Sequence, residues 1–119
     1  MQTVAYLLVA IVAALHLFFL YLEMIAWDTP AGRKVFGTTP EFSAASKALA
    51  ANQGLYNGFL AAGLVWGIYL GNGGFAVTVF FLICVIVAGI FGALTVSRKI
   101  LFVQALPGMV ALLVYALLR

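Results

Sequence analysis

The amino-acid sequence predicts an all-α integral membrane protein, an antiparallel four-helix bundle that forms one domain over residues 1–119. Its composition, 66% hydrophobic and 8% charged, leaves too little charge to cover the surface of a water-soluble domain. Four apolar runs also approach the roughly 20 residues that a helix needs to cross a bilayer. Strands are not expected, because open strand edges leave polar backbone groups unsatisfied in lipid. The predicted spans are about 3–26, 53–70, 75–96 and 100–118.

The first apolar run has no Lys or Arg before it, so it is expected to be a spanning helix rather than a cleaved signal peptide. A connection containing Pro30 follows. The next helix is predicted to begin at Thr39-Pro40-Glu41, where Thr39 suits the N-cap, Pro40 the first helical position and Glu41 the positive end of the helix dipole. Apolar residues at helical spacing continue to Leu70. We therefore expect one long helix from Pro40, whose start extends into the cytoplasm.

The other two connections are short. Gly71-Asn72-Gly73-Gly74 is typical of a tight turn, and Ser97-Arg98-Lys99 joins the third run to the fourth. Short connections make neighbouring helices antiparallel, which predicts an up-down-up-down order. Within the fourth run, Pro107 has no amide hydrogen and leaves the carbonyl of Val103 without its helical donor, so a bend is expected there.

Basic residues predict the orientation in the membrane. Five of the six lie in the first and third connections, namely Arg33, Lys34, Lys47, Arg98 and Lys99. Arg119 stands alone at the other side. The positive-inside rule therefore places these two connections in the cytoplasm and both termini outside, in a multi-pass protein of the inner cell membrane.

Two ionisable residues, His16 and Glu23, lie within the first predicted span. Such residues are costly in lipid and are the first candidates for function. They are seven residues apart, so they share a helix face at a separation of roughly 10 Å, too far for a direct hydrogen bond. Glu23 could equally serve function or reach the interface as a structural group. His16 is better explained as a hydrogen-bonded packing residue than as a metal ligand, since the sequence has one His and one Cys.

Amides on two other helices are predicted to lie at the depth of Glu23. Gln53 and Asn57 are four residues apart on the second helix, and Gln104 lies about one turn inside the fourth. With Thr95 of the third helix, antiparallel threading is expected to bring Glu23, Asn57 and Gln104 to one level in the cytoplasmic half of the bundle. The alternative is that they only form hydrogen bonds between helices.

Small residues form two ridges on the second helix, at positions 54, 58, 62 and at positions 63, 67, 71. Small residues let helices approach closely in lipid. The opposite side carries Leu55, Phe59, Trp66 and Leu70. The pattern predicts a central second helix with its amides turned inward and its bulky side outward.

These features favour a binding or transport protein for a small, partly apolar molecule, neutral or cationic. The predicted ligand-binding residues are Glu23, His16, Gln53, Asn57 and Gln104. No catalytic residue, metal or cofactor is assigned. The expected partners are membrane lipid, the small molecule and further copies of the chain in a dimer or trimer, and not nucleic acid. Two alternatives stay open: an interaction protein whose polar and glycine residues serve packing and oligomerisation, and an enzyme on a lipophilic substrate that uses His16 and Glu23.

The chain also resembles the bacterial membrane-protein family called domain of unknown function 1304. The resemblance rests on His16, Leu22-Glu23-Met24, Trp27, Gly32-Arg33-Lys34-Val35-Phe36, the stretch Ala51-Asn52-Gln53-Gly54-Leu55-Tyr56-Asn57-Gly58, Val87-Ala88-Gly89, Gln104 and Pro107. It implies four spans and no established activity. A weaker architectural similarity links the chain to the glutathione- and eicosanoid-metabolising MAPEG proteins, which have four spans and form trimers. Those proteins use Arg, Asn and Glu of the second helix for glutathione. Here the stretch holds Asn52, Gln53 and Asn57 without Arg or Glu, so the similarity extends to architecture only.

Overall fold

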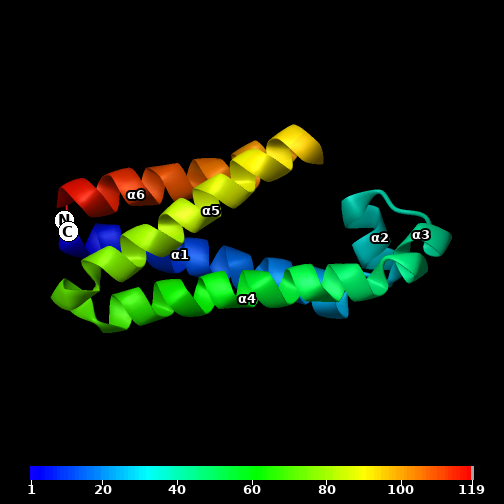
Figure 1. The fold of residues 1–119 in the computed structure, drawn as a ribbon, viewed down its shortest axis with the longest axis horizontal. Coiled ribbons are helices and arrows are strands. Elements are labelled where there is room, and N and C mark those ends of the chain that lie inside the picture. Colours follow the sequence, from blue (N-terminus) through cyan, green and yellow to red (C-terminus); the bar gives the residue numbers. More distant parts are fainter. Residues whose placement is uncertain (119) are drawn as a thin grey trace. The chain divides into compact units, whose positions relative to one another are not determined.

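The computed structural model describes residues 1–118, and within this range the regular elements are helices and no strand is present. Their order is α1 (Gln2–Leu20), the π-helical segment η1 (Tyr21–Ile25), α2 (Pro30–Phe36), α3 (Pro40–Ala45), α4 (Lys47–Tyr69), the 3-10 turn η2 (Gly71–Gly74), α5 (Phe75–Thr95), the π-helical segment η3 (Leu101–Ala105) and α6 (Leu106–Leu118). Figure 1 shows this order along the chain. The predicted all-α class is confirmed.

Three of the described helices are long and apolar enough to cross a membrane: Gln2–Ile25, Gly71–Thr95 and Leu101–Leu118. They correspond to the first, third and fourth predicted spans. The second predicted span falls in α4, which is not in this group. Its amino-terminal half contains Lys47, Asn52, Gln53 and Asn57, and these polar side chains lower its hydropathy. Length and composition therefore support three of the four predicted spans and leave the span in α4 unconfirmed.

Contacts along the chain divide it into two compact units. The apolar unit consists of Met1–Ala14 and Leu60–Arg119, and the polar unit of Leu15–Phe59. The helices α1 and α4 each contribute to both units. Each unit is described by itself below.

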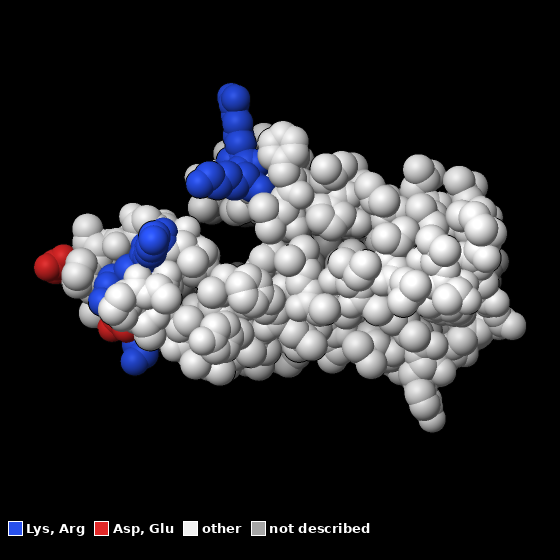
Figure 2. Space-filling model, turned by 180° about the vertical axis from the view of Figure 1, so that it is seen from behind, with Lys and Arg blue, Asp and Glu red and all other residues white. Residues whose placement is uncertain are grey.

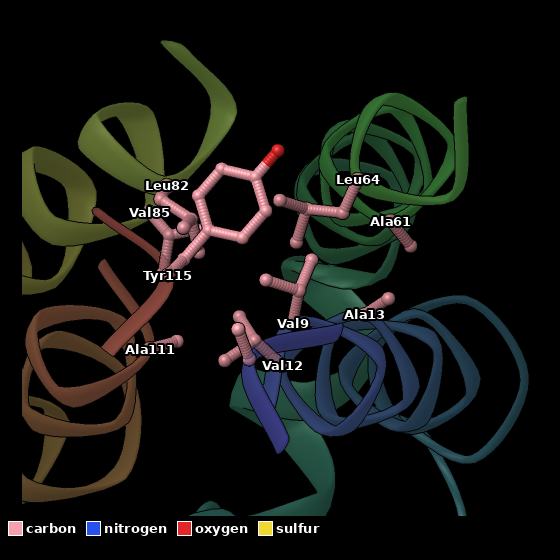
Figure 3. Close-up of a cluster of buried hydrophobic side chains, with 10 residues drawn as sticks. Val9, Val12, Ala13, Ala61, Leu64, Leu82, Val85, Ala111 and Tyr115 are labelled. Carbon is pink, nitrogen blue, oxygen red and sulfur yellow. The ribbon is translucent and has the colours of Figure 1, made fainter. Parts of the chain in front are cut away.

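The core of the apolar unit is built from four helices. Its buried residues are Ala5, Val9, Val12 and Ala13 of α1, Ala61 and Leu64 of α4, Leu82 and Val85 of α5, and Ala111 and Tyr115 of α6. Figure 3 shows the ring of Tyr115 between the α5 side chains Leu82 and Val85 and the α4 side chain Leu64. The same ring packs edge-on against Tyr6 and stacks on Phe75, with centroid distances of 5.9 and 5.8 Å. These two contacts hold the beginning of α1, the beginning of α5 and the end of α6 together.

Glycines set how closely the helices of the apolar unit approach. A side chain at Gly67 would overlap Thr78, and one at Gly63 would overlap Phe81, so α4 and α5 are antiparallel neighbours. A Cβ at Gly89 would stand 2.6 Å from the amide nitrogen of Ala105, which puts α5 and η3 in near backbone contact. Such close approach maximises van der Waals packing, the main force between helices where the surroundings are as apolar as the side chains.

The predicted tight turn after α4 is present as η2. Gly71 adopts φ +60°, a left-handed conformation that disfavours a side chain. Nearby, Gln2 donates a hydrogen bond to Asn72 Oδ1 over 3.2 Å, which joins the start of α1 to this turn. Figure 1 shows α5 and α6 as the hairpin that follows the turn.

The bend predicted at Pro107 appears as the π-helical segment η3, which ends two residues before the proline. The amide of Leu106 donates to the carbonyl of Leu101, five residues back. The widened turn is consistent with the nearby proline, which has no amide hydrogen to donate to the helix.

The polar unit contains a second π-helical segment, η1, where the amide of Ala26 donates to the carbonyl of Tyr21 over 3.0 Å. The start of α3 follows the prediction: the Thr39 side chain accepts a hydrogen bond from the amide of Phe42, Pro40 is the first helical residue, and Glu41 lies in the first turn. The preceding α2 ends at Gly37, whose φ of +67° forms a left-handed C-cap.

The predicted continuous helix from Pro40 to Leu70 is wrong at one residue, Ser46, which separates α3 from α4. The hydroxyl of Ser46 donates to the carbonyl of Phe42 over 2.7 Å, in competition with the normal amide donor. Serine bonds of this kind bend helices. The break therefore has a cause in the side chain that stands there.

Candidate functional site

The polar unit brings a carboxylate and an amide into contact. Glu23 lies in η1, Asn57 lies in α4, and the Asn57 side-chain amide donates a hydrogen bond to Glu23 Oε1. Gly54, one turn before Asn57, makes this approach feasible. A Cβ there would overlap the Met24 side chain and stand 3.2 Å from Glu23 Cβ. The predicted pairing of these two helices at the depth of Glu23 is therefore present within this unit.

Trp27 ties the chain after η1 to α3. Its indole nitrogen donates to the carbonyl of Ser43 and to the hydroxyl of Ser46, both over 3.1 Å. The buried hydroxyl of Ser43 donates in return to the carbonyl of Trp27 over 3.0 Å. On its other side the indole packs against Phe36 at 4.7 Å between centroids. These contacts hold the indole in one place, which an aromatic anchor at a lipid interface would not need.

The short helix α2 is fixed by its own polar contacts. The Thr29 hydroxyl accepts from the amide of Gly32 and donates to the carbonyl of Ala26 over 2.6 Å. A side chain at Gly32 would overlap that same carbonyl, so the close turn requires glycine. Arg33 forms an ion pair with Asp28 at 2.9 Å. The guanidinium of Arg33 thus has its counter-charge outside the Glu23 site.

Beside Glu23 lies an open pocket of about 260 Å³. Its described lining comprises Glu23, Trp27, Phe42, Ser46, Leu49, Ala50 and Gln53. All of these residues belong to the polar unit. Of the lining residues that the structure describes, Glu23 alone has an ionisable side chain.

Apart from Glu23, the charged side chains that the structure describes lie between η1 and the start of α4 or in the connection after α5. On the face drawn in Figure 2, charged atoms lie over the α2 and α3 region of the polar unit and at the connection after α5 in the apolar unit. The remaining surface visible in that view is uncharged. The Glu23 carboxylate therefore stands apart from an otherwise apolar or neutral pocket wall.

The five predicted binding residues have different positions. Glu23 and Gln53 line the pocket, and Asn57 binds Glu23 from the adjacent turn of α4. His16 is fully buried in the polar unit and packs edge-on against Phe19, at 5.2 Å between centroids. Gln104 is half-buried in η3 of the apolar unit and is not among the lining residues. The structure thus brings three of the five together, while His16 has the surroundings of a packing residue.

Trp27, Ser43 and Ser46 were not predicted as site residues, because Trp27 at a helix end is typical of an interfacial anchor. A signal was present in the sequence. Ser43, Ser46, Ala50, Gly54 and Asn57 recur at intervals of three or four residues, which places them on one helix face. Three of them, Ser43, Ala50 and Gly54, are buried. This helix face includes Ser46 and Ala50, which line the pocket, and Asn57, which binds Glu23.

The chemistry available to the pocket is that of one carboxylate, an aromatic wall and small neutral polar groups. Among the residues described, no group of three or more His, Cys, Asp or Glu side chains could hold a metal ion. The arrangement is suited to binding a cation by charge and apolar contact.

Comparison with known proteins agrees with the resemblance noted in the sequence. The profile of the family described as "Protein of unknown function (DUF1304)" matches residues 10–116. The uncharacterized protein YpaA of Lactococcus lactis subsp. lactis is 29% identical over 115 residues, which cover 94% of this chain and 97% of that protein. No solved structure matches the chain. The match extends over residues of both units.

Proposed function

Because the chain belongs to the DUF1304 family, whose function is unknown, its activity has to be inferred from its own residues, and we propose that it binds a small, partly apolar cation in the pocket beside Glu23. The observation that carries the proposal is the pocket itself. It places one carboxylate, held by Asn57, in a wall otherwise formed by aromatic, aliphatic and neutral polar side chains.

The charge balance of the polar unit supports a cationic ligand. Arg33 is engaged by Asp28, while Lys34 and Lys47 are exposed and are not among the pocket residues described. A carboxylate in apolar surroundings is costly without a counter-charge. A bound cation would supply that counter-charge, with Trp27 as an aromatic wall.

We further propose that α4 is a fourth membrane span, so that the chain forms an antiparallel four-helix bundle. Residues 55–70 of α4 and its end contain few polar groups, and Leu55, Phe59, Trp66 and Leu70 are exposed on one side, as expected for a surface in contact with lipid. With α4 spanning, the basic connections before α4 and after α5 fall on one side of the membrane. The positive-inside rule makes this side the cytoplasm.

Cysteine labelling tests this topology. In a Cys84→Ser background, single cysteines at Lys34 and Lys99 should react with a membrane-impermeant maleimide only from the cytoplasmic side, and one at Gln2 only from outside. Labelling of Lys34→Cys and Lys99→Cys from opposite sides would contradict a spanning α4.

The glycine residues offer less support for self-association than their spacing suggests. Gly54 and Gly58 face Met24 and Leu20 within the polar unit, and Gly63 and Gly67 face Phe81 and Thr78 within the apolar unit. These ridges are occupied by neighbouring helices of the same chain. The dimer or trimer stays a prediction, and the binding function is the better supported of the alternatives.

Native mass spectrometry of gently purified protein tests the proposed binding. Wild type is compared with Glu23→Gln, which removes the carboxylate, and with Glu41→Gln, which removes an exposed carboxylate of α3 outside the pocket. The proposal expects a small-molecule adduct in wild type and Glu41→Gln that is lost in Glu23→Gln. An adduct kept equally in all three proteins would place the ligand elsewhere. The oligomer count is obtained from the same spectra.

Transport is a separate step beyond binding. Vesicles containing the protein would take up a fluorescent lipophilic cation in response to a pH gradient if Glu23 exchanged cation for proton. Uptake that ignores both the gradient and Glu23→Gln would restrict the function to binding.

A further inference from the structure

We propose that the connection after α5 binds an anionic phospholipid of the surrounding membrane, with its phosphate at Arg98 and Lys99 and its acyl chains along the exposed apolar side chains beside them. This lipid site belongs to the apolar unit and is independent of the pocket beside Glu23. Three features of the unit support it: an excess of positive charge, the free side chains of the basic pair, and the place of the connection between two apolar helices.

The apolar unit contains basic residues and no acidic residue. The sequence has three Asp and Glu residues, and all three fall within Leu15–Phe59, the polar unit. Among the residues that the structure describes, the apolar unit carries Arg98 and Lys99, both exposed. No ion pair or hydrogen bond joins either side chain to another described residue. Their counter-charge therefore has to come from outside the unit.

The basic residues of the polar unit are in a different position. Arg33 is paired with Asp28 at 2.9 Å. With Lys34 and Lys47 it makes three basic residues, which the three acidic residues of the same unit match in number. The formal net charge of +3 therefore belongs entirely to the apolar unit. An anionic partner is attracted more strongly to Arg98 and Lys99 than to the lysines of the polar unit.

The connection holds the basic pair on a closely bonded turn. The amides of Val96 and Ser97 both donate to the carbonyl of Gly92, over 2.8 and 3.1 Å. The amide of Lys99 donates to the Ser97 hydroxyl over 3.3 Å. A Cβ at Gly92 would stand 3.0 Å from Ile100, so the chain on either side of the turn stays close together. Figure 2 shows the basic side chains of this connection standing out from an uncharged surface.

The surroundings of the connection match the two chemistries of a phospholipid. The helices on either side, Gly71–Thr95 and Leu101–Leu118, are both long and apolar enough to cross a membrane, so the turn between them is expected at the head-group layer. Next to the basic pair, Leu94, Val96 and Phe102 are 81%, 78% and 64% exposed. A phosphate bound by the pair leaves its acyl chains beside these apolar side chains.

Lipid titration followed by native mass spectrometry tests the site. Full-length protein, freed of co-purified lipid in detergent, is titrated with phosphatidylglycerol and with phosphatidylcholine of identical acyl chains, and the Kd of the first bound lipid is compared. A basic residue near an anionic lipid surface contributes about a fivefold preference. Because two such residues act together here, wild type should bind phosphatidylglycerol more tightly by about tenfold or more.

Two double variants locate the preference. Arg98→Gln/Lys99→Gln should bind both lipids alike, while Lys34→Gln/Lys47→Gln should keep the wild-type preference. Both variants remove two positive charges, so a difference between them cannot come from net charge. All four side chains are exposed, so both proteins should fold, and circular dichroism checks this.

The remaining results would overturn the lipid site. They are an equal loss of preference in both variants, which indicates a general attraction of charge, a preference kept in Arg98→Gln/Lys99→Gln, and a wild type without preference. Glycerol phosphate, a head group without acyl chains, should leave bound phosphatidylglycerol in place when present at the same concentration. Displacement under that condition would assign the connection to a soluble phosphate instead of a lipid. The wild-type comparison of the two lipids does not depend on the stability of a variant.

Discussion

The two units of this chain use the same helices for different purposes. In the apolar unit, α1, α4, α5 and α6 enclose aliphatic side chains and one tyrosine, and glycines bring the backbones close. In the polar unit, η1 and α4 meet at the hydrogen bond from Asn57 to Glu23, and a pocket opens beside it. The first arrangement buries apolar side chains, and the second holds the polar groups to which we assign the proposed binding function.

The two π-helical segments, one in each unit, also differ from each other. The segment η3 ends two residues before Pro107, so the missing amide hydrogen of the proline accounts for its widened turn. The segment η1 has no proline in or directly after it; instead it carries Glu23 and precedes Trp27. Single π turns within α-helices occur often at functional sites. By this comparison η1, rather than η3, is the segment that coincides with the proposed site.

The largest expected effect on stability is that of Gly89→Leu, which would disrupt close helix packing in the apolar unit. The new side chain would collide with the backbone of Ala105, and backbone cannot move aside as a flexible side chain can. The cost should exceed the roughly 1–3 kcal/mol typical of overpacking, so little folded protein should be recovered by size-exclusion chromatography in detergent. Gly73→Leu is the control, since nothing lies within 4 Å of its Cβ position. Normal recovery of Gly89→Leu would contradict the close approach.

A cavity in the apolar core should have the next largest effect. Leu82→Ala removes a fully buried side chain and should lower the free energy of unfolding by about 2–5 kcal/mol, as measured by chemical denaturation in micelles. Ile83→Ala, on a residue 46% exposed, should change it little. If the units have separate roles, folded Leu82→Ala should still retain the small-molecule adduct of the wild type in native mass spectrometry. A parallel loss of the adduct would weaken the division of roles.

Asn57→Leu should affect the polar unit by leaving Glu23 without its hydrogen-bond donor. The expected loss in the free energy of unfolding is about 1–3 kcal/mol, together with weaker cation binding. The loss should shrink in a Glu23→Leu background, where no carboxylate remains to be satisfied, and this double-mutant cycle isolates the pair. An identical loss in both backgrounds would show that Asn57 acts through packing alone.

The smallest expected effect is that of Ser46→Ala. It removes the hydroxyl that accepts from Trp27 and donates to the Phe42 carbonyl, at a cost of about 0.5–1.5 kcal/mol in unfolding free energy. In a Trp66→Phe background, where Trp27 is the remaining tryptophan, its fluorescence maximum should shift to longer wavelength as the indole loses its fixed position. Ser46→Thr, which keeps a hydroxyl, should restore the wild-type spectrum. If the fluorescence maximum of Trp27 does not shift in Ser46→Ala, Ser46 does not help to hold Trp27 in the pocket wall.

Much of the fold could be predicted from local sequence. The cap at Thr39, the proline at the start of α3, the glycine turn at Gly71 and the distortion before Pro107 each follow from the backbone chemistry of one or two residues. The pairing of Glu23 with Asn57 was also predictable, because glycines four residues apart mark the helix face that approaches most closely.

Other features required the tertiary structure. The pocket wall depends on contacts of Trp27 with Ser43 and Ser46, which are 16 and 19 residues away in the chain, and no helical periodicity reports contacts at that distance. The burial of His16 against Phe19 and the place of Gln104 in the other unit likewise depend on how helices turn about their axes. Sequence determined the helices, their caps and the approach of Glu23 to Asn57, since these follow from local geometry and small residues. Only the tertiary structure decided which polar side chains share a pocket, because that choice is made by contacts between segments distant in sequence.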